Sequence, residues 1–501
     1  MRKFQLSFVV LFFVFLTLPV VSIGLFGGAG SYGNFAKSSL PSVQSFFAKH
    51  KARKQAADHI FQASPMKKAA VSAKGELTYA LGAVNTNRVF SGEGDWLFFK
   101  AQFEPYRCEN RRYLKRSLER LDVIASVAEV SDIDVLFSVS PNKYSIYPDK
   151  SGALGVNFSD CYHESLLLVR DTIANYRAKN VILFHDALEK ARADGIHVFR
   201  ENDTHWTSAG GLYALAALSS YYLNDDLLSY LRAQKQKPKK TDSKSDMGNT
   251  MLLISRNDFN SVPAEIVVNK VSQRMSKESG KILVIHDSFF ASVRPMLNKF
   301  FPKLKTNHFS TEVGKLSSDL AAYDKVLVNI VERNIFNLIQ RPTLGWNSPL
   351  GKEILKRNAA IVSDCFINDD DDWLSTYRDK LQMVNINENE LGNVFVPTNT
   401  DPIIVADISG IDHKGSICLE VDVAIETGST FEIFLAGKSW PGPGRKWVPG
   451  RSIEKRLKAG SHKVQLLLPI GEDDDAVRID PFGKKQSFTI NGIKIKPYKD
   501  K

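Results

Sequence analysis

Three residues of the chain have the types that nucleophilic acyl chemistry requires: an acid, an imidazole and a hydroxyl. Asp203 and His205 stand two positions apart. In an extended segment, residues i and i+2 point the same way, so we expect both side chains to reach into one cleft. Ser288 follows the short apolar run 282–285 far downstream. An acid that orients a histidine base, and a base that deprotonates a serine, could carry out serine-dependent acyl transfer or hydrolysis.

Each of these residues also has an ordinary interpretation. A single histidine is more often a surface or satisfied core residue than a catalytic base. A serine after a strand is usually a turn residue. Only the combination favours a catalytic site.

The elements around these residues predict an α/β domain at about residues 80–340. Apolar patterns predict strands at 135–139, 181–184, 198–199, 282–285 and 326–331, and helices at 110–130, 165–179, 187–192 and 289–301. Strands and helices that alternate at this spacing are typical of βαβ units with a parallel sheet. Ser288 would then stand at the carboxyl edge of that sheet, where α/β folds display catalytic groups. A helix that begins near Thr207 or Ser208, both good N-caps, would fix the Asp203 segment.

The last hundred residues have a different pattern. From 401 to 501, short alternating runs are separated by glycine- and proline-containing turns, which predicts a small β-sandwich. Trp440, Trp447 and Phe482 could form a sugar-stacking surface there or serve as core and loop anchors. The connecting region 341–400 contains four consecutive aspartates, 369–372, without the glycine and glutamate spacing of a calcium loop. We interpret them as a solvated acidic turn, and the chain offers no metal or cofactor motif.

The net charge and the positions of the basic residues limit the classes of molecule that the chain could bind. The formal net charge is +11, and basic residues gather at 49–68 and 232–244. Such runs could bind nucleic acid, anionic lipid or polysaccharide, or be solvated linkers. No nucleic-acid fold signature accompanies them, so we expect no nucleic-acid partner. The Lys- and Gln-rich run after Leu231 predicts a flexible surface insertion.

The N-terminus predicts export. Arg2 and Lys3 precede an apolar run from Phe4 to Phe26. This run is long enough to cross a bilayer as a helix, which needs about 20 residues. We expect residues 1–27 to be an uncleaved anchor in the cell inner membrane, with the body in the periplasm. A cleaved signal peptide, which would leave a secreted or periplasmic protein, is the alternative. Residues 28–79 would be a linker or stalk, with any helix there interrupted at Pro65. Four cysteines permit two disulfides, in any of three pairings.

Separated motifs resemble those of the alginate O-acetyltransferase family of AlgX and AlgJ type, over roughly residues 80–340. The motifs are Gly94-Asp95-Trp96-Leu97-Phe98, Pro141-Asn142-Lys143 with Tyr147-Pro148, Asp203-Thr204-His205-Trp206, His286-Asp287-Ser288-Phe289 and Val331-Glu332-Arg333. Ordinary SGNH hydrolases place the serine first and an Asp-x-x-His pair near the C-terminus. Here an Asp-x-His pair precedes the serine, as in the permuted family.

The resemblance implies a circularly permuted SGNH-hydrolase-like domain with three layers and a parallel sheet. It also implies that Asp203, His205 and Ser288 are catalytic. For the second oxyanion donor beside the Ser288 N–H, we expect Asn142. Lys143 and Arg333 would hold acidic sugar or form structural salt bridges. Trp206 would pack against the histidine or stack on sugar.

The function expected from these observations is acetyl transfer to hydroxyls of an exported bacterial polysaccharide through an acetyl-serine intermediate. No cofactor is needed. The resemblance implies a membrane-bound O-acyltransferase partner that supplies acetyl groups, and a C-terminal domain in the place where AlgX carries a carbohydrate-binding module. Two alternatives remain: an esterase that uses the same triad with water as acceptor, and a non-catalytic polysaccharide-binding or assembly protein.

Overall fold

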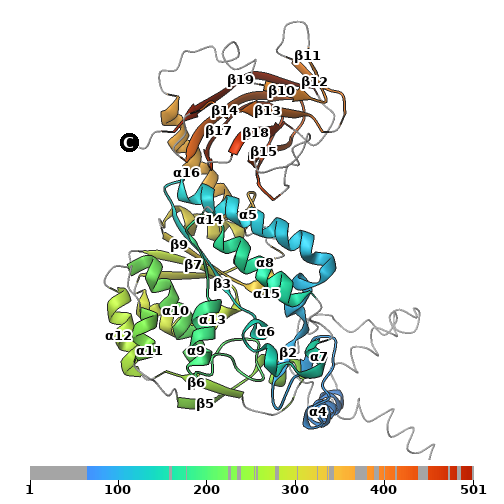
Figure 1. Ribbon diagram of the computed structural model, residues 1–501, viewed down its shortest axis with the longest axis vertical. Coiled ribbons are helices and arrows are strands. Elements are labelled where there is room, and N and C mark those ends of the chain that lie inside the picture. The colour runs from blue at the N-terminus through green and yellow to red at the C-terminus, as the bar shows by residue number, and fades with distance from the viewer. Residues whose placement is uncertain are drawn as a thin grey trace, which may run out of the picture.

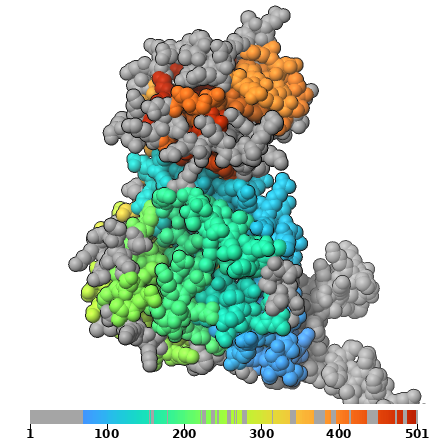
Figure 2. Space-filling view, in the orientation of Figure 1, coloured from blue at the N-terminus to red at the C-terminus, as the bar shows by residue number. Residues whose placement is uncertain are grey.

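The computed structural model places an α/β domain and an all-β domain in two lobes (Figures 1 and 2). The lobe drawn in blue to yellow holds the α/β domain, and the lobe drawn in orange and red holds the β domain. The described residues are 65–156, 161–176, 178–223, 227–233, 239–252, 254, 258–263, 265–276, 281–301, 303–323, 325–335, 337, 344–366, 381–388, 394–399, 401–411, 415–437, 450–471, 474–481 and 487–498.

A parallel five-stranded sheet forms the centre of the α/β domain. Its spatial order is β4-β3-β9-β7-β8, and every neighbouring pair is parallel. The strands are β3 (Asp134–Ser140), β4 (Val181–Leu183), β7 (Ile282–His286), β8 (Leu304–His308) and β9 (Lys325–Val331). Every residue of β7, and all of β9 after Lys325, is buried, as expected of near-continuous apolar strands covered on both faces. The predicted α/β class with a parallel sheet is confirmed.

Helices pack in two groups that flank this sheet (Figure 1). One group includes α9 (His185–Ala193), α10 (Ser208–Leu223), α11 (Leu227–Ala233), α12 (Glu265–Ser276) and α13 (Ser288–Phe300). The other includes α5 (Arg111–Glu129), α8 (Tyr162–Ala174), α14 (Val313–Ala321) and α16 (Pro349–Cys365). Shorter turns are α6 (Lys143–Ile146), α7 (Gly152–Val156), α15 (Glu332–Ile335), η2 (Lys100–Gln102), η3 (Glu104–Tyr106), η4 (Cys108–Asn110) and η5 (Pro148–Lys150). The apolar runs located α5, α8, α9 and α13 to within five residues, whereas α12, α14 and α16 were not predicted.

The strand expected at 198–199 does not form. Phe199 makes only an isolated bridge to Trp206. The chain turns back at once, and the Arg200 N–H donates to the His205 carbonyl at 3.3 Å. Two apolar residues followed by a polar turn are too short to join the sheet.

The described part of the Lys- and Gln-rich run after Leu231 contains a β-strand, which the sequence did not predict. β5 (Lys239–Ser243) pairs antiparallel with β6 (Asp258–Val262), and a π-helical segment, η6 (Asp246–Leu252), lies between them. We call residues 239–262 the arm. The five residues of β5, KKTDS, include no apolar residue, so no alternating pattern predicts a strand there. The hairpin is held instead by its ladder and by polar contacts to the Asp203 segment.

The described chain begins with α4 (Pro65–Ala80). Pro65 is the first described residue of this helix, and proline is tolerated in a first helical turn because an N–H there has no partner within the helix. The residues before Pro65, on which the expected interruption depends, lie outside the described part of the chain. Tyr79 near the end of α4 donates to Asn202 Oδ1 at 3.0 Å, beside the Asp203 segment. A short antiparallel pair follows, β1 (Val89–Ser91) with β2 (Leu97–Phe99). The expected anchor, residues 1–27, lies outside the described part of the chain. No helix within the described part is long and apolar enough to span a bilayer.

Two five-stranded antiparallel sheets form the C-terminal domain, which confirms the predicted antiparallel β-structure. Their orders are β10-β13-β18-β15-β16 and β11-β12-β19-β14-β17. The strands are β10 (Leu381–Val384), β11 (Ile386–Glu388), β12 (Val394–Pro397), β13 (Ile403–Asp407), β14 (Ser416–Ile425), β15 (Ser429–Gly437), β16 (Ser452–Leu457), β17 (Gly460–Pro469), β18 (Asp474–Asp480) and β19 (Phe488–Pro497). The aspartates 369–372 and the aromatic residues Trp440, Trp447 and Phe482 lie outside the described residues.

Helix α16 joins the two domains. Asn358, fully buried, donates to the Leu467 carbonyl at 2.9 Å and accepts from the Leu467 N–H at 2.7 Å. Cys365 at the end of α16 forms a disulfide with Cys418, and Cys108 forms one with Cys161. The structure therefore selects one of the three pairings that the sequence left open.

Candidate active site

Polar residues converge at the carboxyl edge of the parallel sheet. Asn142 follows β3, Ser288 follows β7, and Glu332 and Arg333 follow β9. These three strands are the middle ones, with β9 between β3 and β7. The carboxyl edge at a change in strand order is where open α/β sheets bind ligands.

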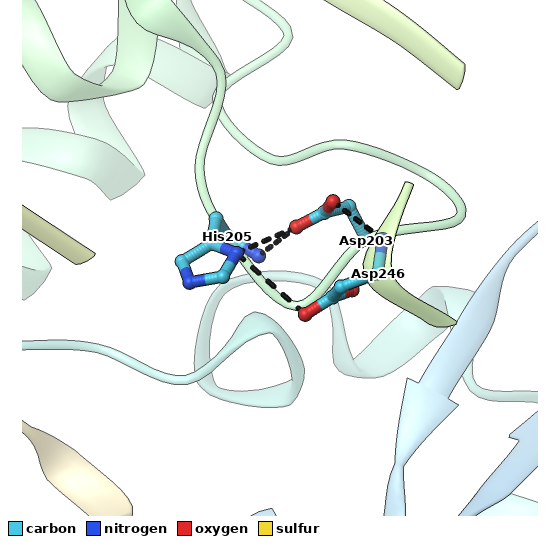
Figure 3. Close-up of side chains that lie close together, drawn as sticks. All are labelled: Asp203, His205 and Asp246. Carbon is cyan, nitrogen blue, oxygen red and sulfur yellow. Dashed lines mark hydrogen bonds and ion pairs between the residues drawn. The ribbon is translucent and has the colours of Figure 1, made fainter. Parts of the chain in front are cut away.

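Asp203 and His205 meet as the sequence predicted, but through a bend and not an extended strand. Asp203 Oδ1 accepts from the His205 backbone N–H at 2.9 Å and lies 2.7 Å from His205 Nδ1 (Figure 3). Such an aspartate turn holds the acid and the imidazole together within three residues. The helix expected next is α10, and Thr207 caps it: its Oγ1 accepts from the Gly210 N–H at 3.0 Å.

The acid is held ionised. Burial alone would raise the pKa of Asp203, but the hydrogen bonds and charge of His205, together with Arg200 at 3.5 Å, lower that pKa to about 2. Asp203 Oδ2 also accepts from the Asp246 backbone N–H at 2.8 Å. A carboxylate with several donors favours the charged form. It therefore holds the proton of a neutral His205 on Nδ1, which leaves Nε2 as the basic nitrogen.

His205 Nε2 is buried and has no hydrogen-bond partner among the described residues. The His205 ring packs 5.1 Å from the ring of Phe289, the residue after Ser288. Ser288 is exposed and begins helix α13. The basic histidine and the candidate nucleophile therefore belong to the same corner of the domain.

Asp287 fixes the turn that carries Ser288. Its Oδ1 accepts from the Phe289 N–H at 2.9 Å and caps α13, and its Oδ2 accepts from the Val331 N–H at 2.6 Å at the end of β9. The backbone N–H of Ser288 is in the first turn of α13, where N–H groups have no partner within the helix. That turn can offer an oxyanion donor.

Asn142 and Arg333 lie together at the same edge. Arg333 donates to Asn142 Oδ1 at 3.1 Å, and its guanidinium lies 5.2 Å from the centre of the Phe289 ring. Asn142 is fully buried, and its Nδ2 has no hydrogen-bond partner in the described part of the structure. Burial lowers the pKa of Arg333, and Asp287 and Asp246 oppose that effect. Arg333 therefore places a cation near the serine turn, and the Asn142 amide also faces the buried hydroxyl of Tyr162.

Lys143 and Trp206 are placed differently. Lys143 is 3% exposed; its ammonium donates to the carbonyls of Leu97 and Glu201, both at 2.9 Å, and burial lowers its pKa to about 8. Trp206 is 1% exposed, donates to Ser292 Oγ at 3.0 Å and packs 5.2 Å from the Phe289 ring. Both side chains hold the walls of the site together, and neither has a free face for a sugar.

A buried carboxylate, Glu332, lies behind Asn142. It accepts from the Asn142 backbone N–H at 2.7 Å, from Ser145 Oγ at 2.6 Å and from the Tyr106 hydroxyl, and lies 3.3 Å from His185 Nε2. Burial would raise the pKa of Glu332, but His185 and the hydroxyl donors outweigh it and lower that pKa. The sequence places Glu332 in one of the quoted motifs but does not predict this role. Its position directly after β9, beside Asn142 after β3, is the feature that could have indicated it.

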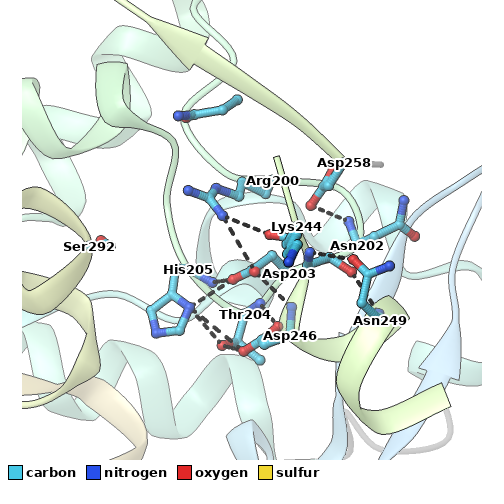
Figure 4. A network of polar contacts seen from close by, with 12 residues as sticks. Arg200, Asn202, Asp203, Thr204, His205, Lys244, Asp246, Asn249, Asp258 and Ser292 are labelled. Atoms are coloured by element: carbon cyan, nitrogen blue, oxygen red, sulfur yellow. Dashed lines mark hydrogen bonds and ion pairs between the residues drawn. The ribbon is translucent and has the colours of Figure 1, made fainter. Parts of the chain in front are cut away.

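The arm contributes Asp246, which the sequence did not single out because it follows the Lys- and Gln-rich run and belongs to none of the quoted motifs. Its Oδ2 is 3.6 Å from His205 Nδ1 (Figures 3 and 4). Within the described residues, Asp203, His205 and Asp246 are the one group whose ligand atoms could meet a metal ion, all within 4.8 Å. A cation there would have to displace the hydrogen bond between Asp203 and His205. The donor set therefore fits an acid–base pair better than a metal centre.

Residues 89–288 match the family model described as the SGNH hydrolase-like domain of the acetyltransferase AlgX. This segment, about two fifths of the chain, is similar to that domain. The match contains Asp203 and His205 and ends at Ser288, and it confirms the resemblance that the separated motifs predicted.

Solved structures give a weaker likeness. The O-acetyltransferase domain of Pseudomonas putida AlgJ is 17% identical, with a TM-score of 0.33, over 50% of this chain and 92% of its own. Pseudomonas aeruginosa AlgX is 9% identical, with a TM-score of 0.33, over 81% and 93%. The CBM35 from Paenibacillus barcinonensis is 9% identical, with a TM-score of 0.18, over 24% and 96%. All three TM-scores are below 0.5, too low to carry a functional assignment. No curated protein matches the sequence.

Proposed function

We propose that this protein is an O-acetyltransferase that moves acetyl groups to hydroxyls of an exported polysaccharide through an acetyl-serine. The observation that carries the proposal is the Asp203–His205 pair, whose Nε2 is buried and unpaired beside the Ser288 turn. The AlgX-type acetyltransferase match over residues 89–288 supports the acyl group and the reaction class.

In the first half-reaction, His205 Nε2 takes the proton from Ser288 Oγ as Oγ attacks the carbonyl carbon of an acetyl donor. The tetrahedral intermediate collapses, and the donor's leaving group departs with that proton from Nε2. In the second half-reaction, a sugar hydroxyl gives its proton to Nε2 and attacks acetyl-Ser288. The new sugar ester forms, and Ser288 Oγ recovers the proton from His205.

The oxyanion of each tetrahedral intermediate needs donors that are already in place. The backbone N–H of Ser288 is one, since it lies in the first turn of α13. Asn142 Nδ2 is the second, because it is buried, unpaired and held from behind by Arg333 and Glu332. The guanidinium of Arg333 lies 5.2 Å from the centre of the Phe289 ring, next to Ser288. Its positive charge would attract an acidic sugar to this part of the site.

The two disulfides support export of the protein, because disulfides form and persist in oxidising compartments outside the cytoplasm. We propose a periplasmic body held by residues 1–27, and a membrane-bound O-acyltransferase as the partner that supplies acetyl groups where cytoplasmic acetyl donors are absent. The two antiparallel sheets of the C-terminal domain, joined to the catalytic domain by α16, would bind the polymer chain.

A chromogenic acetyl ester offered to the purified full-length chain tests the proposal. The reaction is run with and without candidate oligosaccharides, and intact-mass measurement detects acetylated sugar. The expected result is acetylated sugar from the wild type and none from Ser288→Ala. Serine-dependent release of acetate at a rate that no acceptor changes would favour an esterase. No serine-dependent turnover would favour a non-catalytic binding protein.

A further inference from the structure

We propose that Asp246 is a second carboxylate that acts on His205: a positioning residue that holds the catalytic turn and, with Asp203, balances the charge that His205 gains during acyl transfer. The inference rests on the proposed function and assigns a role to the arm, residues 239–262. The arm lies outside every motif that supports the family resemblance.

The contacts of Asp246 all converge on the catalytic turn. Its Oδ1 accepts from the Thr204 backbone N–H at 2.8 Å, and its Oδ2 accepts from the Thr204 hydroxyl. Its own backbone N–H donates to Asp203 Oδ2 at 2.8 Å. Its Oδ2 lies 3.6 Å from His205 Nδ1, on the same side of the ring as Asp203 (Figure 3). One residue of the arm therefore contacts all three residues of the turn.

The rest of the arm holds the flanks of the turn. Asp258 accepts from the Glu201 N–H at 3.2 Å and from the Asn202 N–H at 3.0 Å (Figure 4). Asn260 Oδ1 accepts from the Ser208 N–H at 2.8 Å. Backbone N–H groups on both sides of the catalytic pair thus end on side chains of the arm. A polar bend with no strand of its own needs such partners to keep one geometry.

The electrostatic step follows from distance. When His205 takes a proton, it becomes an imidazolium that faces two carboxylates on its Nδ1 side. Asp203 Oδ1 lies 2.7 Å and Asp246 Oδ2 lies 3.6 Å from Nδ1. The second carboxylate stabilises that charge less than the first, because it is farther from Nδ1 and its side chain is 28% exposed. It still favours the protonated form over the neutral one. Asp246 therefore lowers the barrier of each proton transfer to His205.

Other charges face this cluster, and they set the background for any pH measurement. They are Arg200, 3.5 Å from Asp203; Lys143, which interacts with Asp203 and Asp246; Arg333, which interacts with Asp246; and Glu201 and Asp258, which interact with Lys143. Asp246→Asn keeps the side-chain shape and leaves these groups in place, while it removes the negative charge with which Lys143 and Arg333 interact. A change in pH dependence in Asp246→Asn therefore reports the missing charge.

Sulfonylation of Ser288 by phenylmethylsulfonyl fluoride tests the inference without a polysaccharide or an acetyl donor. Ser288 Oγ attacks the sulfur, fluoride leaves, and His205 takes the serine proton, so the rate reports the base directly. The rate is followed by intact mass between about pH 5 and about pH 9, where histidine titrates. Wild type, Asp246→Asn, Asp246→Glu and Asp258→Asn are compared as full-length chains.

For Asp246→Asn we expect a plateau about tenfold lower and an acid limb shifted to lower pH by about half a unit. Asp246→Glu keeps the negative charge, so the midpoint of its acid limb should equal that of the wild type. Asp258→Asn is the matched control: it removes an equivalent arm carboxylate that has no contact with His205, and its midpoint should not move.

Three results would overturn the inference. If Asp246→Asn shows the plateau and midpoint of Asp258→Asn, the arm only braces the turn and Asp246 has no action on His205. If Asp246→Glu shifts the midpoint as far as Asp246→Asn, the charge is not the cause. If wild-type Ser288 is not labelled at any pH, the proposed function fails, and the inference that rests on it fails too.

Discussion

The α/β domain contains two acid–histidine pairs, and they have opposite surroundings. In the first, Asp203 lies 2.7 Å from His205, whose side chain is 17% exposed and whose Nε2 has no described partner. In the second, Glu332 lies 3.3 Å from His185, whose side chain is 1% exposed. The first pair lies beside an exposed serine, whereas the second is surrounded by Tyr106, Ser145 and the Asn142 backbone.

The difference shows that residue types alone do not make a catalytic pair. Each histidine has one buried ring nitrogen without a hydrogen-bond partner among the described residues, Nδ1 in His185 and Nε2 in His205. Of the two rings, the His205 ring is the one that packs against Phe289, the residue after the candidate nucleophile Ser288. A buried carboxylate with several donors instead links elements, and Glu332 joins the ends of β3 and β9 to α9 and η3. One pair is available for chemistry, and the other holds the edge of the sheet on which that chemistry depends.

Replacing each histidine with alanine should show the largest difference between the two pairs. His205→Ala should lower kcat for Ser288-dependent ester turnover by at least about 10³-fold, because it removes the proposed base, and should change Tm less than His185→Ala does, because the His205 side chain is less buried. His185→Ala should do the reverse: a large fall in Tm and a smaller fall in kcat in the fraction that stays folded. Steady-state kinetics and thermal unfolding check both. Equal kinetic losses in the two variants would contradict the assignment of roles.

Glu332→Gln should cost about 3 kcal/mol in the free energy of unfolding, since it leaves His185 and the surrounding donors without a buried charge. Denaturant unfolding measures this loss. Glu129→Gln is a suitable comparison, because Glu129 also accepts two backbone N–H groups but is exposed. A Glu332→Gln variant as stable as Glu129→Gln would show that the buried pair has no structural role.

Asn142→Ala should lower kcat by about 10²-fold, as the loss of one oxyanion donor does, with KM for the ester little changed. The backbone N–H that Glu332 accepts is kept, so the fold should survive. Asn142→Asp keeps an oxygen for Arg333 and removes the side-chain N–H, and we expect the same loss. Full activity in both variants would exclude Asn142 from the oxyanion site.

The smallest expected effect is a pH dependence of stability. Because the pKa of Asp203 is lowered to about 2 in the folded chain, its ionised form stabilises the fold above the unfolded value of about 3.9. That contribution, about 2 kcal/mol, is lost as the pH falls through the folded value. The stability gap between wild type and Asp203→Asn should therefore narrow from about pH 5 to about pH 2. Urea unfolding at several pH values measures the gap, and a constant gap would contradict the lowered pKa.

Much of the fold was predictable from sequence because its strands are continuous apolar runs. β7 and β9 were located to within a residue, and their parallel arrangement placed Ser288 and Arg333 at one edge. The Asp203–His205 pair was found from spacing alone, although a bend and not a strand brings the two together. Apolar pattern carries this information because burial on both faces leaves little choice of residue.

The arm could not be predicted in the same way. Lys239 and Lys240 begin a strand that is stabilised by pairing and by polar contacts, neither of which leaves an apolar pattern. Asp246 acquires its role only through contact with a turn about 40 residues earlier, and His185 only through Glu332 across the sheet. Partnerships between distant polar residues depend on the folded geometry, so one sequence does not reveal them.

Detection of the acetyl-enzyme tests the central claim most directly. The full-length chain is mixed with an activated acetyl ester, quenched in acid at short times and measured by intact mass and peptide mapping. We predict that the wild type gains the mass of one acetyl group on Ser288, that an acceptor sugar shortens the lifetime of this species, and that neither Ser288→Ala nor His205→Ala forms it. Acetyl transfer to sugar in Ser288→Ala, or an acetyl group on another residue that the acceptor consumes, would contradict the account.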